Sequence, residues 1–372
     1  MDTVFIGKKT RPVIDITIVS PCPTRLLYLI WGKRMKKTLL AVALAAGFSA
    51  AAHAQSANVS LYGVVDTFLE FNSGGTESRS AVQSGGMSGS RWGIKGSEDL
   101  GGGLKANVKL ESGYFVDTGS SAQGGLLFGR QAFVGLSGGF GSVNVGRQYS
   151  PFFDVVNIGD AFETGYASPY SNGSIYTAVR VNNAIRYDSP NLSGFTGSLM
   201  WGANETAGKS GDGLMNVAVQ YAGGPIAAGF SYVDDKLTVG TETKAYTLQG
   251  SYDLSVARVY AGYVHAKFDS ATDLTNDGYH VGTQIKAGGG AVWAQFASGK
   301  LKEVSNSTSQ TISLGYNYNL SARTNVYAMF QYTKNDSAAA FGTGAANSAN
   351  DYTSVLAGQD PKGLALGIRH AF

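Results

Sequence analysis

Cysteine is almost absent from this chain, since Cys22 is the only one and lies in a segment that we expect to be removed. A mature chain without cysteine has no disulfide, no thiolate nucleophile and no thiolate metal site. Histidine is also scarce: after residue 54 only His265, His280 and His370 occur, far apart and without metal-ligand spacing. The sequence therefore predicts neither a metal site nor another cofactor.

Long hydrophobic runs are missing too, apart from a short one near the N-terminus. Residues 35–54 start with two lysines after Met35, continue with a short apolar stretch and end in Ala52-His53-Ala54. This is the pattern of a cleaved secretory signal peptide, and its apolar stretch is too short to span a bilayer. We interpret residues 1–34 as an upstream start extension, or alternatively as an unusual leader, and residues 55–372 as the mature domain.

The mature chain also lacks an excess of positive charge. The segment up to residue 54 holds eight of the 29 Lys and Arg residues and two of the 26 Asp and Glu residues, so its removal changes the formal charge from +3 to −3. The basic character of the full sequence is thus a property of the leader. It gives no reason to expect nucleic acid as a partner.

What the chain has in abundance is glycine, with 51 residues, and tyrosine plus phenylalanine, with 20 and 18. Between turn residues, strand-like runs alternate apolar and polar side chains with a period of two. The runs number sixteen and cover residues 59–71, 88–99, 104–117, 126–137, 142–150, 181–189, 195–204, 213–222, 226–235, 243–254, 257–268, 278–287, 290–300, 308–320, 324–334 and 362–372.

The connections between these runs alternate in length without exception. Short turns such as residues 101–103, 223–225 and 288–290 alternate with longer polar loops such as 72–87 and 335–361. A closed membrane barrel with short turns at one end and long loops at the other has this pattern, whereas a soluble β-sandwich has no reason to. The sequence predicts an all-β fold, a 16-stranded antiparallel transmembrane β-barrel with short periplasmic turns and long external loops.

The faces of the strands agree with a barrel in lipid that has a wet interior. In residues 311–318, Ile312 and Leu314 alternate with Thr311 and Ser313, and in residues 181–188 Val181, Ile185 and Tyr187 are expected outside, with Asn182, Arg186 and Asp188 inside. A half-buried soluble sheet would alternate in the same way. The leader and the alternating loop lengths favour the membrane barrel.

One connection is about twice the length at which a loop inside a compact domain is usually functional or disordered. Residues 151–180 carry Phe152, Phe153, Ile158 and Phe162, which a disordered segment would not contain. The segment is therefore expected to fold back and pack, and it is the third of the long loops.

Several motifs together support a family resemblance. They are the opening Val59-Ser-Leu-Tyr-Gly-Val-Val-Asp66, Ser90-Arg-Trp-Gly, Phe128-Gly-Arg-Gln-Ala-Phe-Val-Gly-Leu136, Arg186-Tyr-Asp-Ser-Pro190 and the terminal Phe372. In this order the chain resembles the general trimeric porins of Gram-negative bacteria, most of all the β-proteobacterial type of Neisseria, Comamonas and Burkholderia. The resemblance covers essentially the whole mature chain. It implies a homotrimer in which the third long loop folds into each pore and constricts it.

The resemblance also implies that basic residues of the barrel wall face acidic groups of this loop. Arg91, Arg130 and Arg186 match the wall arginines, and Lys95 shares the face of Arg91. Arg147 shares the parity of the apolar Val143 and Val145, so it faces inward only if the strand ends or bulges there. The loop lacks the Pro-Glu-Phe-Gly tip of enteric porins, which leaves Asp154, Asp160 and Glu163 as candidate acids of the constriction.

An enzyme is not expected. Residues 135–139 match the G-x-S-x-G pattern, but a nucleophile elbow needs a strand, a turn and then a helix, and here another strand follows. Charges on opposite sides of a narrow aqueous channel instead set its ion preference, and arginine suits the wall because it stays charged at any relevant pH.

The sequence thus predicts a porin of the outer membrane, a passive diffusion channel for small hydrophilic solutes and ions. Its expected partners are other copies of the chain in a homotrimer, outer-membrane lipid and lipopolysaccharide, and the diffusing solutes and ions. A substrate-selective porin for sugars or anions is the alternative within the same class. A barrel that acts mainly as an adhesin or structural anchor is the alternative from another class.

Overall fold

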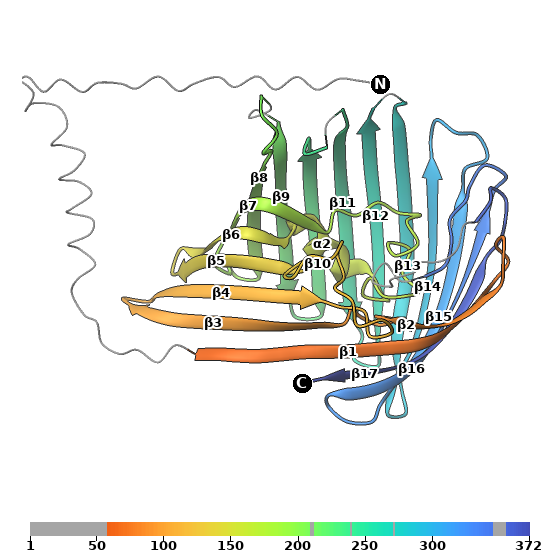
Figure 1. Ribbon diagram of the computed structural model, residues 1–372, viewed down its shortest axis with the longest axis horizontal. Helices are drawn as coiled ribbons and strands as arrows, with labels where there is room; N and C mark the ends of the chain where they lie inside the picture. Colours follow the sequence, from red (N-terminus) through yellow and green to blue (C-terminus); the bar gives the residue numbers. More distant parts are fainter. Residues whose placement is uncertain (1–57, 209–211, 239, 271, 345–354) are drawn as a thin grey trace, which may run out of the picture. The chain divides into compact units, whose positions relative to one another are not determined.

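The computed structural model describes residues 58–208, 212–238, 240–270, 272–344 and 355–372. Residues 55–372 form one compact unit (Figure 1). The expected leader, residues 35–54, and the preceding residues 1–34 lie outside the described residues.

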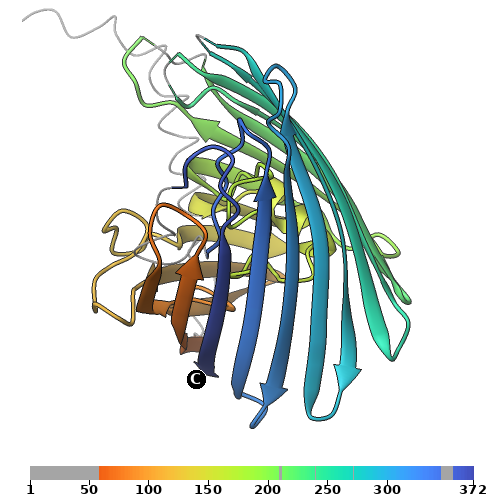
Figure 2. The same ribbon diagram turned by 90° about the vertical axis from the view of Figure 1, so that its right-hand side faces the viewer.

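The regular secondary structure of this unit is mostly antiparallel sheet. The strands follow each other along the chain as β1 (Asn58–Ser73), β2 (Arg79–Ser84), β3 (Arg91–Gly101), β4 (Leu104–Gly113), β5 (Gln131–Gly138), β6 (Gly141–Tyr149), β7 (Arg180–Asp188), β8 (Phe195–Ala203), β9 (Gly213–Gly223), β10 (Ile226–Asp235), β11 (Glu242–Asp253), β12 (Ala257–Asp269), β13 (Leu274–Ala287), β14 (Gly290–Leu301), β15 (Ser309–Asn319), β16 (Thr324–Asn335) and β17 (Lys362–Ala371). One helix, α2 (Pro151–Gly159), interrupts the series between β6 and β7. Figure 2 shows the C-terminal strands running side by side as a continuous wall.

The sheet closes on itself. The first strand, β1, pairs with β17 from Val64↔Ala371 to Ser73↔Lys362. Its other edge pairs with β3 over its N-terminal half and with β2 over its C-terminal half. The 17 strands of the sheet therefore occupy sixteen places around the ring, because β2 and β3 share one. The predicted sixteen-stranded antiparallel barrel is confirmed.

The short strand β2 was not predicted, because the sequence analysis assigned residues 72–87 to a loop. Arg79–Ser84 is only six residues long, with Gly85 and Gly86 directly after it. Such a short run between polar turn residues has too few alternating positions to be recognised as a strand. It forms because the C-terminal half of β1 would otherwise have an unpaired edge.

The distribution of side chains on the sheet is the reverse of that in a soluble protein, with apolar residues on the outer face and polar residues on the inner face. Large apolar side chains such as Leu248, Val281 and Leu314 are 59%, 54% and 50% exposed on the outer face. Polar side chains such as Gln249 and Ser313 are buried on the inner face. Within the described residues, no helix is long and apolar enough to cross a membrane. An outward apolar band and a polar interior are what a barrel in a bilayer requires.

One predicted face is wrong. Val181 was expected on the outer face, but it is 3% exposed and belongs to a buried cluster inside the barrel. The register between β6 and β7 shifts between Gly146 and Gln148, and Asn183 has a φ of 51°. A bulge of this kind inserts a residue and exchanges the two faces of the strand beyond it. Ile185 and Tyr187, on the other side of the bulge, are exposed as predicted.

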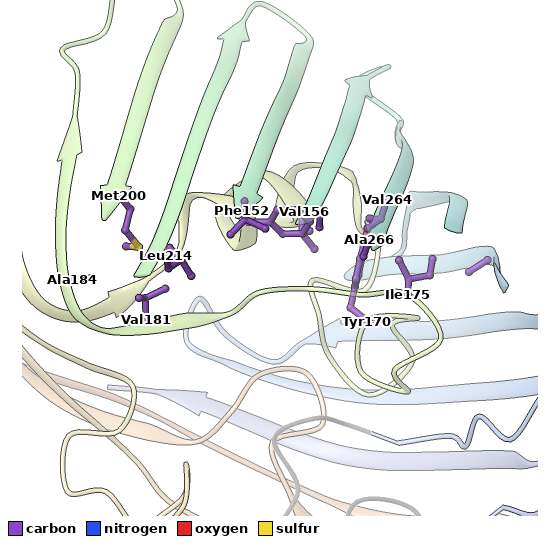
Figure 3. Close-up of a cluster of buried hydrophobic side chains, with 13 residues drawn as sticks. Phe152, Val156, Tyr170, Ile175, Val181, Ala184, Met200, Leu214, Val264 and Ala266 are labelled. Atoms are coloured by element: carbon purple, nitrogen blue, oxygen red, sulfur yellow. The ribbon is translucent and has the colours of Figure 1, made fainter. Parts of the chain in front are cut away.

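Residues 151–180 fold into the barrel, as predicted. Pro151 begins α2, and the Ser150 hydroxyl caps the helix by accepting a hydrogen bond from the Phe153 backbone NH at 3.0 Å. Phe152 and Val156 of the helix pack with Val264 and Ala266 of β12 in one buried cluster (Figure 3). Full burial of a side chain of this size contributes about 1.5–3 kcal/mol, so the segment is held firmly against the wall.

Glycines of the wall make room for this segment. A Cβ atom added at Gly363 of β17 would collide with the Tyr166 hydroxyl, and one added at Gly299 of β14 would collide with the Ser174 backbone oxygen. Only glycine permits such close approach of the backbone. The position of the segment therefore depends on glycines in strands that lie more than a hundred residues away in the sequence. We refer below to residues 151–179 as the constriction loop.

Candidate functional site

Between the constriction loop and the opposite wall lies a cavity of about 520 Å³. Its lining brings together arginines of the wall with acids and aromatic residues: Arg91, Arg130, Tyr149, Phe153, Asp160, Glu163, Arg180, Arg258, Tyr260 and Arg369 are among its members. Five of these are cations and two are carboxylates. The cavity therefore has an excess of fixed positive charge.

Tyr149, at the end of β6, holds two of the arginines. Its hydroxyl accepts a hydrogen bond from Arg130 Nη2 at 2.6 Å and another from Arg180 Nη2 at 2.7 Å. The Arg180 guanidinium also lies 4.5 Å from the centre of the tyrosine ring, and Phe153 of α2 stacks on that ring at 5.1 Å. Arg130 pairs with Glu111 at 2.9 Å as well. Both guanidinium groups are thus preorganised by contacts within the protein.

Arg91 and Arg369 are oriented by residues 85–90, which follow β2. Arg91 Nη1 donates to the Gly89 carbonyl at 2.9 Å, and Arg369 Nε donates to the Ser88 hydroxyl at 3.0 Å. The segment itself is fixed by Asp66, whose carboxylate accepts backbone NH groups of residues 86–88 at 2.9–3.1 Å. The buried Asp66 therefore acts on the cavity through this segment rather than by lining it.

Arg258, on β12, lies on the inner face together with Tyr260. Its Nη2 donates to the Ser251 hydroxyl at 2.9 Å, and its guanidinium lies 5.5 Å from the Tyr260 ring centre. Unlike Arg130, it is exposed to the lumen. Its charge is therefore accessible from the cavity.

The three candidate acids occupy different environments. Glu163 is exposed to the lumen at the cavity, whereas Asp160 is fully buried. The Asp160 carboxylate accepts hydrogen bonds from the backbone of Phe162 and Thr164 and from the Ser168 hydroxyl. Asp154 does not line the cavity and instead pairs with Arg186 at 2.7 Å. Asp160 organises the loop, and Glu163 is the acid that solutes can meet.

Glu163 and Thr164 have φ angles of 52° and 57°, a left-handed conformation that non-glycine residues rarely adopt. The hydrogen bonds to Asp160 hold this turn and direct the Glu163 side chain into the cavity. Enclosure by the barrel raises the pKa of the Glu163 carboxyl, and repulsion by Asp160 adds to the rise. The charges of Arg369 and Arg258 act in the opposite direction on this pKa.

The remaining basic residues expected on the pore wall are not part of the cavity lining. Arg186 lies between Asp154 and Asp188, at 2.7 and 2.8 Å, and attaches α2 to the wall. Lys95 is exposed, with its ammonium 5.5 Å from the Tyr62 ring centre. Arg147 sits at the bulge, but it bonds to the Gly129 carbonyl and to Asn182. The structure thus brings Arg91 and Arg130 together and separates them from these three.

Three cavity arginines were not identified from the sequence: Arg180, Arg258 and Arg369. For Arg369 the signal was present, because the period of two that places Leu364, Leu366 and Ile368 outside places residue 369 inside. Arg258 alternates in the same way with the exposed Val259. Arg180 lies beyond the bulge, where the interrupted alternation of the strand no longer predicts which face a residue is on. Within the part of the chain that the structure describes, no cluster of three or more His, Cys, Asp and Glu side chains could hold a metal ion.

Comparison with known proteins gives consistent results. A family profile described as Gram-negative porin matches residues 41–338. Outer membrane porin protein 32 of Delftia acidovorans is 35% identical over 360 residues, which cover 91% of this chain and 100% of that protein. An outer membrane porin protein of Bordetella pertussis is 32% identical over 373 residues, with coverage of 81% of this chain and 95% of that protein.

Solved structures show the same likeness. An anion-selective porin from Comamonas acidovorans superposes with a TM-score of 0.77 at 32% identity, covering 85% of this chain and 100% of the porin. The trimer form of OmpT from Vibrio cholerae superposes with a TM-score of 0.65 at 18% identity, covering 85% of this chain and 100% of that one. The second likeness concerns the fold alone.

Proposed function

Because the chain belongs to the family of Gram-negative porins, we propose that it is an outer-membrane channel through which small hydrophilic solutes diffuse passively, with a preference for anions. The observation that carries this preference is the cavity lining, with five arginines against two carboxylates. Asp160 is buried and occupied by three hydrogen bonds, which leaves Glu163 as the accessible acid. Fixed charge in a narrow water-filled site attracts counter-ions and excludes ions of the same sign.

The relatives support this proposal, since one similar solved structure is described as an anion-selective porin. We further propose that the protein is a homotrimer embedded in outer-membrane lipid and lipopolysaccharide, as its resemblance to the trimeric porins implies. A barrel that served mainly as an adhesin or anchor would have no need of a loop folded into its lumen or of arginines preorganised around a cavity.

The test is conductance in a planar lipid bilayer. Purified protein should insert as units that carry current in steps of three equal levels, as expected for three pores per trimer. An absence of stepwise current would remove the channel proposal. Saturable block of the current by one sugar or one anion would replace it by the substrate-selective alternative.

We also propose that Ala54 is the last residue of the cleaved leader, on the basis of the Ala52-His53-Ala54 pattern. Protein isolated from the outer membrane should then begin at Gln55, as determined by N-terminal sequencing. A mature N-terminus before Met35, or no cleavage at all, would contradict this assignment.

The anion preference should increase as the pH falls. A carboxyl with a raised pKa is charged above that pKa and loses its charge as the pH drops through it, so Glu163 becomes neutral at a pH above the ordinary glutamate value of about 4.3. The ratio of chloride to potassium permeability, from reversal potentials, should rise between about pH 7 and pH 4.5. E163Q should already have the higher ratio at neutral pH and show little further change.

A matched control is D273N, which removes one exposed carboxylate between β12 and β13, outside the cavity lining. This variant should retain the wild-type pH dependence of the permeability ratio. An E163Q channel with an unchanged ratio at neutral pH would contradict the placement of Glu163 at the narrow part of the pore.

A further inference from the structure

The contact between the constriction loop and strands β9–β17 is almost free of ionisable groups. Hydrogen bonds link backbone and side-chain atoms of the loop to wall residues of these strands that are neutral amides or hydroxyls: Asn216, Gln249, Asn276, Gln284, Gln295, Thr311, Ser313 and Thr333. Among the described hydrogen bonds across this contact, the exception is His280 of β13, which bonds to Tyr170 of the loop. It is the residue there that can gain a charge near neutral pH.

The geometry around His280 indicates a neutral ring. Gln249 Nε2 donates to the Tyr170 hydroxyl at 2.8 Å, and that hydroxyl lies 2.9 Å from His280 Nε2. The hydroxyl keeps its own proton to donate, and Nε2 of a neutral ring with its proton on Nδ1 can accept it. The other ring nitrogen, Nδ1, is buried and has no hydrogen-bond partner among the described residues. With 1% of its surface exposed, His280 is cut off from water.

A proton on Nε2 would remove the acceptor on which this arrangement depends. The imidazolium and the Tyr170 hydroxyl would then both present protons, and Nδ1 would carry part of a charge without a partner. Burial of an unpaired charge is among the most costly changes in a protein interior. Lumen water could solvate the charge only if Tyr170 moved away.

While Tyr170 stays on the wall, few groups around His280 could stabilise a positive charge on its ring. Gly262 of β12 and Ala297 of β14 are the register partners of His280, and both are uncharged, as is Gln249 of β11. The charged group that acts on His280 is Asp160 of the loop, which already accepts three hydrogen bonds. Arg258 lies further along β12, beyond Tyr260.

We propose that His280 is the acid-sensitive attachment of the constriction loop: the neutral ring holds Tyr170 on the wall, and protonation of the ring releases this part of the loop into the pore. The inference rests on the proposed channel function. According to this proposal, the protonation state of His280 controls the position of the loop, and a released loop closes the channel in acid.

The experiment compares single-channel recordings at about pH 7 and pH 4.5, on either side of the ordinary histidine pKa of about 6.5. All variants carry E163Q, so that titration of the cavity acid does not contribute. The parent should close about tenfold more often at the lower pH, whereas H280Q, whose amide can accept the Tyr170 hydrogen bond but cannot be protonated, should change less than about twofold.

Two other histidines provide matched controls. His265 bonds to Asp277 and His370 to Thr324, and among the described hydrogen bonds neither has one to the loop. H265Q and H370Q should close as often as the parent at each pH. A loss of acid closure in either control, with H280Q behaving like the parent, would overturn the proposal.

A second variant keeps the proposal falsifiable if H280Q does not assemble. Y170F lacks the hydroxyl that bonds to His280 and should close at neutral pH about as often as the parent does in acid, with no further increase when acidified. A Y170F channel that is quiet at neutral pH and still acid-sensitive would contradict the proposal. These results are separable from the channel function itself, because anion preference at neutral pH is expected to persist in every variant.

Discussion

Replacing Arg258 and Arg369 together by glutamate is expected to convert the anion-preferring channel into a cation-preferring one. The cavity would change from five cations and two carboxylates to three cations and four carboxylates. One unit charge at about 6 Å in water contributes about 0.7 kcal/mol, and about 1.4 kcal/mol is a tenfold effect. A change of four unit charges should therefore lower the ratio of chloride to potassium permeability by more than about tenfold.

These two arginines are suitable because their removal leaves no buried carboxylate unpaired. In the described part of the chain, Arg258 bonds to Ser251 and Arg369 to Ser88, and neither forms an ion pair. Arg130 would be a poorer choice, since Glu111 depends on it. The matched control is K286E/R323E, with the same change in charge at exposed positions outside the cavity lining. Equal selectivity in both double variants would contradict the assignment of the cavity.

Loss of Arg186 should produce the largest change in stability. Its guanidinium lies between Asp154 and Asp188 and also donates to the Tyr149 carbonyl at 2.9 Å. Removing one partner of a fully buried ion pair costs about 3–5 kcal/mol. Because the two carboxylate side chains are 33% and 29% exposed, we expect R186M to lower the free energy of unfolding by about 2 kcal/mol.

Guanidinium-induced unfolding of the detergent-solubilised protein measures this loss. The triple variant R186M/D154N/D188N removes the unpaired charges together with the cation and should recover most of the stability. If R186M and the triple variant were equally unstable, the guanidinium would matter through packing rather than through its charge. If R186M were as stable as the wild type, the attachment of α2 by Arg186 would be wrong.

The fold could be predicted from the sequence because lipid and water impose a simple repeat on it. Ile312 and Leu314 must face lipid and Ser313 the interior, and this alternation recurs in other long strands such as β11 and β16. Features that break the repeat escaped prediction. The bulge between β6 and β7 turned Val181 inward, and β2 is too short to show a period.

The candidate site was less accessible to sequence reasoning, because its members converge from distant strands. Arg369 lies on the last strand and Arg91 on the third, yet both are oriented by adjacent residues of one turn, Gly89 and Ser88. Sequence motifs identify residues one at a time, and the alternation along a strand predicts only whether a side chain is on the inner or the outer face of the barrel. Which cations meet in one cavity depends on where the constriction loop lies, and that depends on hydrogen bonds such as the one from Tyr166 to Asn72, 94 residues apart.

The most direct test of the central claim is the reversal potential of the wild-type channel across a potassium chloride gradient at neutral pH. A constriction with five arginines against a single accessible glutamate predicts that chloride carries most of the current, so that the potential has the sign of the chloride equilibrium potential. A potential of zero, or one with the sign of potassium, would show that the arginine-lined cavity does not control permeation.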